Sequence, residues 1–219
     1  MILEFKNVSG ISKEFNLKNL SFSVETGFIT GITGKNGAGK TTLFHYIMEP
    51  EKNYTGDIMV AGKKLHQHHA ELMNIIGYVS EDNRFFMEKT GKENVDLLSV
   101  FYLNFDTELF HDVMKRMKLS SMKELKNMSR GEYLKFQLAF AMAHKSKLYL
   151  LDEITGGMDP IFRKELYQML QEILMEEDTA IVMSTHIKEE IEMRMDYVGV
   201  MEEGTLVSFQ EVGGEPWTE

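Results

Sequence analysis

The chain has 219 residues, of which 43% are hydrophobic and 26% charged, a balance that suits one large α/β domain and excludes intrinsic disorder. It contains no cysteine, so disulfides, thiolate metal sites and cysteine nucleophiles are excluded. The formal net charge of −10 argues against a nucleic-acid partner, and no apolar run approaches the ~20 residues that a bilayer-spanning helix needs.

The N-terminal part of the chain alternates strand and helix signals. Residues 3–8 and 17–24 alternate apolar and polar side chains, which predicts antiparallel strands with one solvated face. Residues 28–33 form a short β-rich run that leads into a glycine-rich segment. Residues 40–48 then carry the spacing of a helix.

The middle of the chain, residues 83–145, lacks a comparable strand signal. Its apolar spacing predicts helices at 92–103, 107–118 and 131–145. We interpret this region as a helical subdomain inserted into an α/β core that consists of residues 1–82 and 146–212. Together they make one domain of residues 1–219.

The last third returns to strands. Residues 148–151 and 181–183 are compact apolar runs, typical of strands buried on both faces. Helical stretches at 160–176 and 187–195 predict crossover helices of a parallel sheet. Residues 198–209 predict a hairpin, and residues 213–219 a C-terminal tail.

A glycine-rich segment between a predicted strand and a predicted helix carries the strongest motif. Residues 34–41, Gly-Lys-Asn-Gly-Ala-Gly-Lys-Thr, fit the phosphate-binding pattern G-x-x-x-x-G-K-[ST]. Its backbone N–H groups and the positive end of the following helix favour phosphate, Lys40 is expected to reach the β- and γ-phosphates, and the Thr41 hydroxyl to ligate Mg²⁺. The predicted nucleotide-binding residues are Gly34, Asn36, Gly37, Ala38, Gly39, Lys40, Thr41 and Thr42.

An acidic pair ends the predicted strand at 148–151. Asp152 can hold Mg²⁺ through its water shell, and Glu153 can polarise water for attack on the γ-phosphate. The glycine-rich segment and this pair together predict an ATPase whose ligands are ATP and Mg²⁺.

Further motifs resemble those of the ATP-binding cassette (ABC) ATPases. Asn-Met-Ser-Arg-Gly-Glu at 127–132 resembles the signature motif, the acidic pair the Walker B strand end, and Gly-Met-Asp-Pro at 157–160 the D-loop. Ser-Thr-His at 184–186 is similar to the switch histidine, and residues 75–81 to the run into the Q-loop. The resemblance implies a P-loop NTPase core, with a mixed, mainly parallel sheet, an N-terminal antiparallel β part and an inserted all-helical subdomain.

The resemblance also implies roles for single residues. Ser129 and Gly131 would cap a γ-phosphate held by the other subunit, so the site would be completed in a homodimer or in a heterodimer with a paralogue. The remaining implied roles are catalysis for His186 beside Glu153, coupling of the two sites for Asp159, Mg²⁺ ligation for Glu81, and adenine stacking for Phe15 or Ile11.

The sequence departs from the family pattern at two of these motifs. The signature usually reads Leu-Ser-Gly-Gly-Gln, and here Met128, Arg130 and Glu132 replace three of its residues. The Q-loop glutamine is replaced by Glu81. The serine and glycine that contact phosphate remain, so we expect the motif to function.

Among ABC proteins, the resemblance favours the ATPase subunit of a bacterial transporter, at the cytoplasmic face of the membrane and bound to a separate membrane subunit near Phe85, Phe86 and Met87. The alternative is a soluble ABC ATPase of an assembly machine, of the iron–sulfur cluster type. A nucleic-acid ABC ATPase is disfavoured by the single uninterrupted cassette and the acidic charge. The chain looks most like small exporters of peptides and antibiotics, of the bacitracin-resistance and cytolytic-peptide (phenol-soluble modulin) types.

Overall fold

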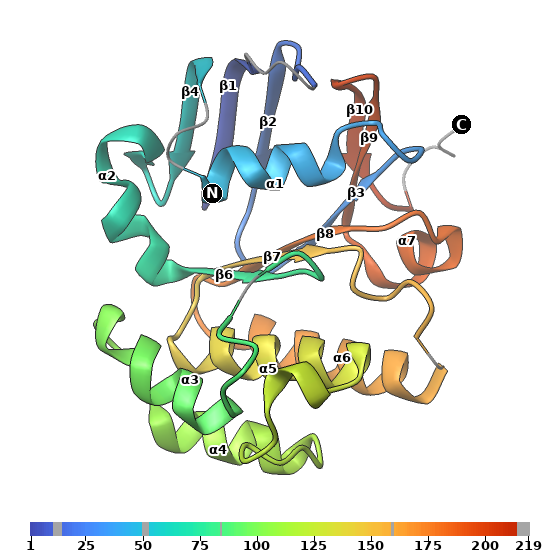
Figure 1. The fold of residues 1–219 in the computed structure, drawn as a ribbon. Coiled ribbons are helices and arrows are strands. Elements are labelled where there is room, and N and C mark those ends of the chain that lie inside the picture. Colours follow the sequence, from blue (N-terminus) through green and yellow to red (C-terminus); the bar gives the residue numbers. More distant parts are fainter. Residues whose placement is uncertain (11–14, 50–52, 84, 159, 214–219) are drawn as a thin grey trace.

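Two sheets organise the computed structural model, which describes residues 1–10, 15–49, 53–83, 85–158 and 160–213 (Figure 1). The smaller sheet is antiparallel, with the strand order β2-β1-β4-β5. Its strands are β1 (Leu3–Gly10), β2 (Leu20–Val24), β4 (Tyr54–Val60) and β5 (Lys63–Lys64). The larger sheet has the order β10-β9-β3-β8-β7-β6.

The larger sheet is parallel apart from the hairpin of β9 and β10 at its edge. Its strands are β3 (Ile29–Thr33), β6 (Ile76–Val79), β7 (Leu148–Asp152), β8 (Ala180–Ser184), β9 (Tyr197–Glu202) and β10 (Thr205–Glu211). Because parallel strands share one direction, β3 and β7 bring the segments that follow them to the same edge of the sheet.

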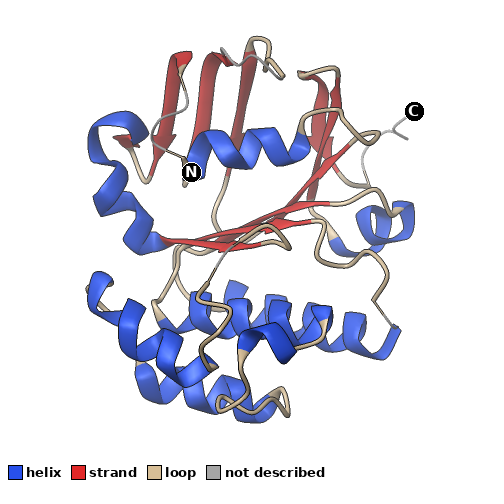
Figure 2. Ribbon diagram, viewed as in Figure 1, coloured by secondary structure: helices blue, strands red, loops and turns tan. Residues whose placement is uncertain are grey.

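Helices cover both faces of the larger sheet (Figure 2). Figure 1 shows α1 between the two sheets, and α3, α4, α5 and α6 on the opposite face of the larger sheet. The helices are α1 (Lys40–Met48), α2 (Leu65–Leu72), α3 (Gly91–Leu98), α4 (Thr107–Arg116), α5 (Arg130–Ala143), α6 (Pro160–Leu174) and α7 (Lys188–Arg194), with 3-10 turns at η1 (Met73–Ile75), η2 (Ser99–Phe101) and η3 (Leu125–Asn127). In the described part of the chain, no helix combines the length and the apolar character that crossing a membrane requires.

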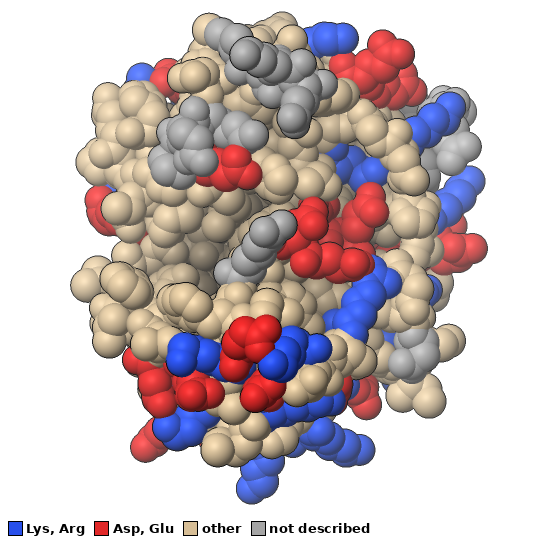
Figure 3. All heavy atoms as spheres, viewed as in Figure 1, with Lys and Arg blue, Asp and Glu red and all other residues tan. Residues whose placement is uncertain are grey.

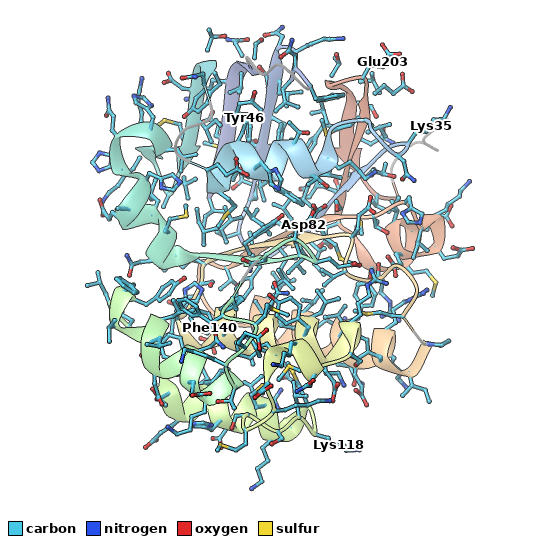
Figure 4. The ribbon with its side chains drawn as sticks, in the orientation of Figure 1. Lys35, Tyr46, Asp82, Lys118, Phe140 and Glu203 are labelled. Carbon is cyan, nitrogen blue, oxygen red and sulfur yellow. The ribbon has the colours of Figure 1, made fainter. Side chains whose placement is uncertain are left out.

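Two hydrophobic cores lie on either side of the larger sheet. The first, which we call the α1 core, joins Phe44 and Tyr46 to the smaller sheet, and the second, the helical core, joins Phe136 and Phe140 of α5 to α4 and α6. Figure 4 shows Tyr46 and Phe140 on opposite sides of the larger sheet. Strand β7 serves both cores with alternate side chains: Leu148 and Leu150 belong to the α1 core, and Tyr149 and Leu151 to the helical core.

Most predicted elements are found, within the usual margin of a few residues at their ends. The helix predicted at 92–103 is wrong beyond Leu98, where the chain turns into η2. The apolar residues that extended the prediction, Val100, Phe101 and Leu103, are 74–84% exposed, so no core contact stabilises a longer helix. Elements β4, β5 and α2 are not predicted from the sequence. Strand β4 contains a glycine and polar side chains that interrupt its apolar alternation, and β5 has only two residues.

Candidate nucleotide-binding and catalytic site

The glycine-rich loop leaves the end of β3 and enters α1, as the motif requires. Gly34, Gly37 and Gly39 all adopt positive φ, at 149°, 82° and 108°. A Cβ on Gly34 would lie 2.3 Å from the carbonyl oxygen of Met201, so only glycine fits there. The N–H of Gly204 donates to the carbonyl of Ala38 at 2.9 Å, which ties the loop to the β9–β10 turn. Figure 4 shows Lys35 and Glu203 on this side of the molecule.

Lys40, the first residue of α1, folds its side chain back into the loop. The ammonium donates to the carbonyl of Gly34 at 2.9 Å and to that of Lys35 at 3.3 Å. It also lies 3.1 Å from Oε1 of Glu153, and only 4% of the side chain is exposed. The loop and the acidic pair are therefore in direct contact in the described structure.

Asp152 lies at the end of β7 beside the first turn of α1. Its carboxylate accepts a hydrogen bond from the Ser184 hydroxyl at the end of β8, and the Thr41 hydroxyl is near enough to lower its pKa. Burial raises the pKa of Asp152 above its ordinary value, and the two hydroxyls oppose that rise. A buried carboxylate beside a threonine hydroxyl is a donor set of hard oxygens that fits Mg²⁺.

Glu153 occupies an unusual backbone conformation, with φ at +48°, although it is not glycine. Its N–H donates to the Ser184 hydroxyl at 2.9 Å, and its side chain is 39% exposed beside Lys40. The hydroxyl of Ser184 thus contacts both acids and links β7 to β8. This contact is not predicted from the sequence. The only signal for it was the position of Ser184 in the Ser-Thr-His segment.

The signature-like segment begins α5. Ser129 is the N-cap: its hydroxyl accepts from the N–H of Glu132, and the Glu132 carboxylate accepts from the N–H of Ser129 at 2.7 Å. Lys123 lies 2.8 Å from the same carboxylate and is the main cause that lowers the pKa of Glu132. Ser129 is exposed, and a Cβ on Gly131 would meet open space, so this helix start is accessible.

Arg130 makes contacts that the sequence does not predict. Its Nε pairs with the carboxylate of Glu81, two residues after the end of β6. Its Nη1 donates to the carbonyl of Gly156, and its Nη2 to that of Glu153 at 3.4 Å. Two of the departures from the family pattern, Arg130 and Glu81, therefore contact one another.

His186 is exposed and follows β8, at the same edge of the sheet as Asp152. Just behind it lies Glu190, a buried acid that the sequence analysis missed. Its carboxylate accepts from the hydroxyls of Thr185 at 2.9 Å and Thr155 at 2.8 Å, and so links the histidine segment to the turn after Glu153. The only sequence signal was an acid in the first turn of a helix.

The remaining predicted site residues are Phe15 and Ile11, Asp159, and the docking segment of Phe85, Phe86 and Met87. Phe15 packs against the loop, because a Cβ on Gly39 would lie 2.6 Å from its ring. Ile11 and Asp159 lie outside the described residues. At the predicted docking segment the three side chains differ. Phe85 packs among aromatic rings of α5, while Phe86 and Met87 are exposed.

The curated proteins similar to this chain include ATP-binding subunits of transporters. It is 31% identical over 196 residues to the ABC transporter ATP-binding protein YtrB of Bacillus subtilis, covering 90% of this chain and 67% of that protein. It is 30% identical to the bacitracin transport ATP-binding protein BcrA of Bacillus licheniformis, in an alignment that covers 88% of this chain and 63% of that protein. It is also 29% identical to the methionine import ATP-binding protein MetN of Protochlamydia amoebophila, in an alignment that covers 95% of this chain and 64% of that protein.

The fold has close counterparts among solved structures. The ATP-binding subunit of an ABC transporter superposes with a TM-score of 0.86 at 24% identity, covering 97% of this chain and 90% of that one. The sequence pattern of the ABC transporter family matches residues 17–156, which include the glycine-rich loop, the signature-like segment and the acidic pair. This chain therefore belongs to the ABC transporter family and is an ATP-binding ATPase with a P-loop α/β fold.

Proposed function

We propose that this chain is the ATP-hydrolysing subunit of a bacterial exporter and works as a dimer beneath a separate membrane subunit. The observation that carries the proposal is the cluster of Lys40, Thr41, Asp152 and Glu153, which β3, α1 and β7 bring together beside the glycine-rich loop.

The proposed chemistry divides the cluster into two parts. The loop from Gly34 to Thr42 binds the phosphates of ATP, with the ammonium of Lys40 as the cation nearest to them. Thr41 and Asp152 would hold Mg²⁺, which neutralises charge on the transferring phosphate, and Glu81, which pairs with Arg130 through Oε1, would add its other carboxylate oxygen. Glu153 orients and deprotonates the attacking water, and His186 contacts the γ-phosphate from the end of β8.

The proposed dimer is supported by the position of the signature-like helix start. Ser129 and Gly131 are accessible at the N-terminus of α5, where backbone N–H groups favour an anion. We propose that they cap the γ-phosphate bound by the partner subunit. Asp159 is proposed to couple the two sites, and Phe15 or Ile11 to stack on adenine.

A membrane partner is favoured by apolar side chains that the helical part exposes. Phe86 and Met87 are 50% and 38% exposed, and Leu97 of α3 and Val100 and Phe101 of η2 are exposed as well. Export of a peptide or antibiotic is the direction we favour, on the similarity to the bacitracin transport protein. The similarity to a methionine import protein makes direction the point to test.

The experiment is reconstitution with the membrane subunit that copurifies with this chain. In vesicles with this subunit on the outside, ATP added outside should drive a labelled amphipathic peptide into the lumen. Release of lumenal substrate to the outside would instead indicate import. Copurification of this chain with soluble proteins and without any membrane subunit would favour an assembly machine.

A further inference from the structure

The side chain of Arg130 joins three segments that meet at the catalytic edge of the sheet. It belongs to the first turn of α5, its Nε pairs with Glu81 after β6, and its two Nη groups donate to the carbonyls of Glu153 and Gly156 after β7. A guanidinium has five N–H donors in a fixed plane, so one side chain can hold all three acceptors at once.

The turn that Arg130 holds is conformationally strained. Glu153 has φ at +48°, a left-handed conformation that is unfavourable for a residue with a side chain. Only surrounding contacts can maintain it. On one side the N–H of Glu153 donates to Ser184, and on the other Arg130 holds the carbonyl of the same residue.

Glu81 gives the guanidinium its orientation. A carboxylate fixes the plane of an arginine through a charge-assisted hydrogen bond. The pair is half-exposed, with Arg130 at 40% and Glu81 at 56%, and an exposed ion pair contributes little to the free energy of unfolding. Its consequence is therefore expected in the geometry of the turn rather than in global stability.

We propose that Arg130 is a positioning residue for ATP hydrolysis: it fixes the peptide of Glu153, and Glu81 holds Arg130 in place. This inference rests on the proposed role of Glu153 as the catalytic base. Because a small misplacement of a catalytic group is costly, losing these contacts should reduce turnover while the phosphate loop remains intact.

The test compares Arg130→Gln with Arg116→Gln in the full chain. Arg116 is a matched control, because it also pairs a half-exposed guanidinium with a glutamate of a distant element, Glu172 of α6, but lies away from the catalytic turn. For both variants we would measure kcat, the affinity for a fluorescent ATP analogue, Tm, and amide hydrogen exchange of residues 153–158.

We expect kcat of Arg130→Gln to fall about 10-fold or more, with ATP affinity within about 2-fold of the wild type. Exchange of residues 153–158 should accelerate in Arg130→Gln and not in Arg116→Gln, while both variants share a similar Tm. The double variant Arg130→Gln/Glu81→Gln should lose less turnover than the product of the two single losses, since the two side chains share one contact.

Two results would overturn this inference but leave the proposed function intact. In the first, Arg130→Gln has the same turnover and the same hydrogen exchange as Arg116→Gln. In the second, Arg130→Gln loses ATP affinity while kcat is unchanged, which would mean that the guanidinium contacts a phosphate. Glu153→Gln is the reference variant. Wild-type turnover in Glu153→Gln would overturn the proposed role of Glu153 and this inference with it.

Discussion

The ammonium of Lys40 lies 3.1 Å from the carboxylate of Glu153. The residue expected to bind phosphate and the residue expected to activate water therefore neutralise one another in this structure. The carboxylate of Glu153 is negatively charged, as the phosphates of ATP are, and it lies beside the ammonium that the phosphates are expected to contact. We therefore expect the phosphates of ATP to displace Glu153 from Lys40. Binding of ATP would thus release the base for the reaction.

The first prediction follows from that pair. Glu153→Gln should bind ATP at least as tightly as the wild type, because Lys40 loses its competing carboxylate, while turnover falls by about 10²–10⁴, the usual contribution of a positioned base. Fluorescent nucleotide titration and phosphate release measure the two effects. Glu165→Gln, which changes an exposed acid of α6, is the control. Unchanged hydrolysis in Glu153→Gln would contradict the assignment.

The second prediction concerns completion of the site by a partner subunit. Lys40→Ala removes the phosphate-binding ammonium and Ser129→Arg blocks the start of α5, so each variant alone should be inactive. If the two features meet across a dimer, mixing the variants should restore one intact site per mixed dimer and part of the ATPase activity. Activity that stays absent at every mixing ratio, in a chain shown to dimerise with ATP, would count against the shared site.

The third prediction separates two neighbouring phenylalanines. The ring of Phe85 lies 5.0 Å from that of Phe136 and 5.1 Å from that of Phe140, whereas Phe86 is 50% exposed. Phe85→Ala should therefore lower the free energy of unfolding by about 3 kcal/mol, and Phe86→Ala by less than about 1 kcal/mol. Urea unfolding measures both.

Assembly should show the reverse order. Phe86→Ala should weaken copurification with the membrane subunit, whereas folded Phe85→Ala should retain it. Equal retention of the membrane subunit by both variants would remove Phe86 from the docking surface.

The fourth prediction is a pH dependence of stability. His144 is 3% exposed beside Tyr102, and burial lowers its pKa from 6.5 to about 4. Between those values the unfolded chain binds a proton that the folded chain does not, so the free energy of unfolding decreases as pH falls through this window. From pH 7 to pH 4.5 the contribution is about 2 kcal/mol.

The variant His144→Gln isolates this contribution from the titration of carboxylates. Unfolding in urea at pH 7 and pH 4.5 should show a wild-type decrease that exceeds the variant's by about 2 kcal/mol. Equal decreases in the two proteins would mean that His144 is protonated in the folded state or does not titrate in this range.

The sequence predicts what depends on local spacing and misses what depends on distant contacts. The glycine-rich loop, α1 and the Asp152–Glu153 strand end could be placed because glycine geometry and buried apolar runs are local properties. The pairing of Arg130 with Glu81 could not, because 49 residues separate them and each alone looks like a neutral substitution.

The docking segment shows the same limit. Phe85 and Phe86 are adjacent in a connection without helical or strand periodicity, so no pattern tells which ring turns inward. The structure decides it through aromatic rings of α5, more than forty residues away. Likewise Glu190 becomes informative only when the fold brings Thr155 and Thr185 to its carboxylate.

The number of residues in strand β7 determines both which side chains enter each core and which way Asp152 points. Its even-numbered side chains face the α1 core, and Asp152 continues that series toward Thr41. Inserting or deleting one residue would therefore turn the acid toward the helical core and place an apolar side chain beside Thr41. Only a change of two residues preserves both, so evolution can vary the identity of residues in this strand far more readily than its length.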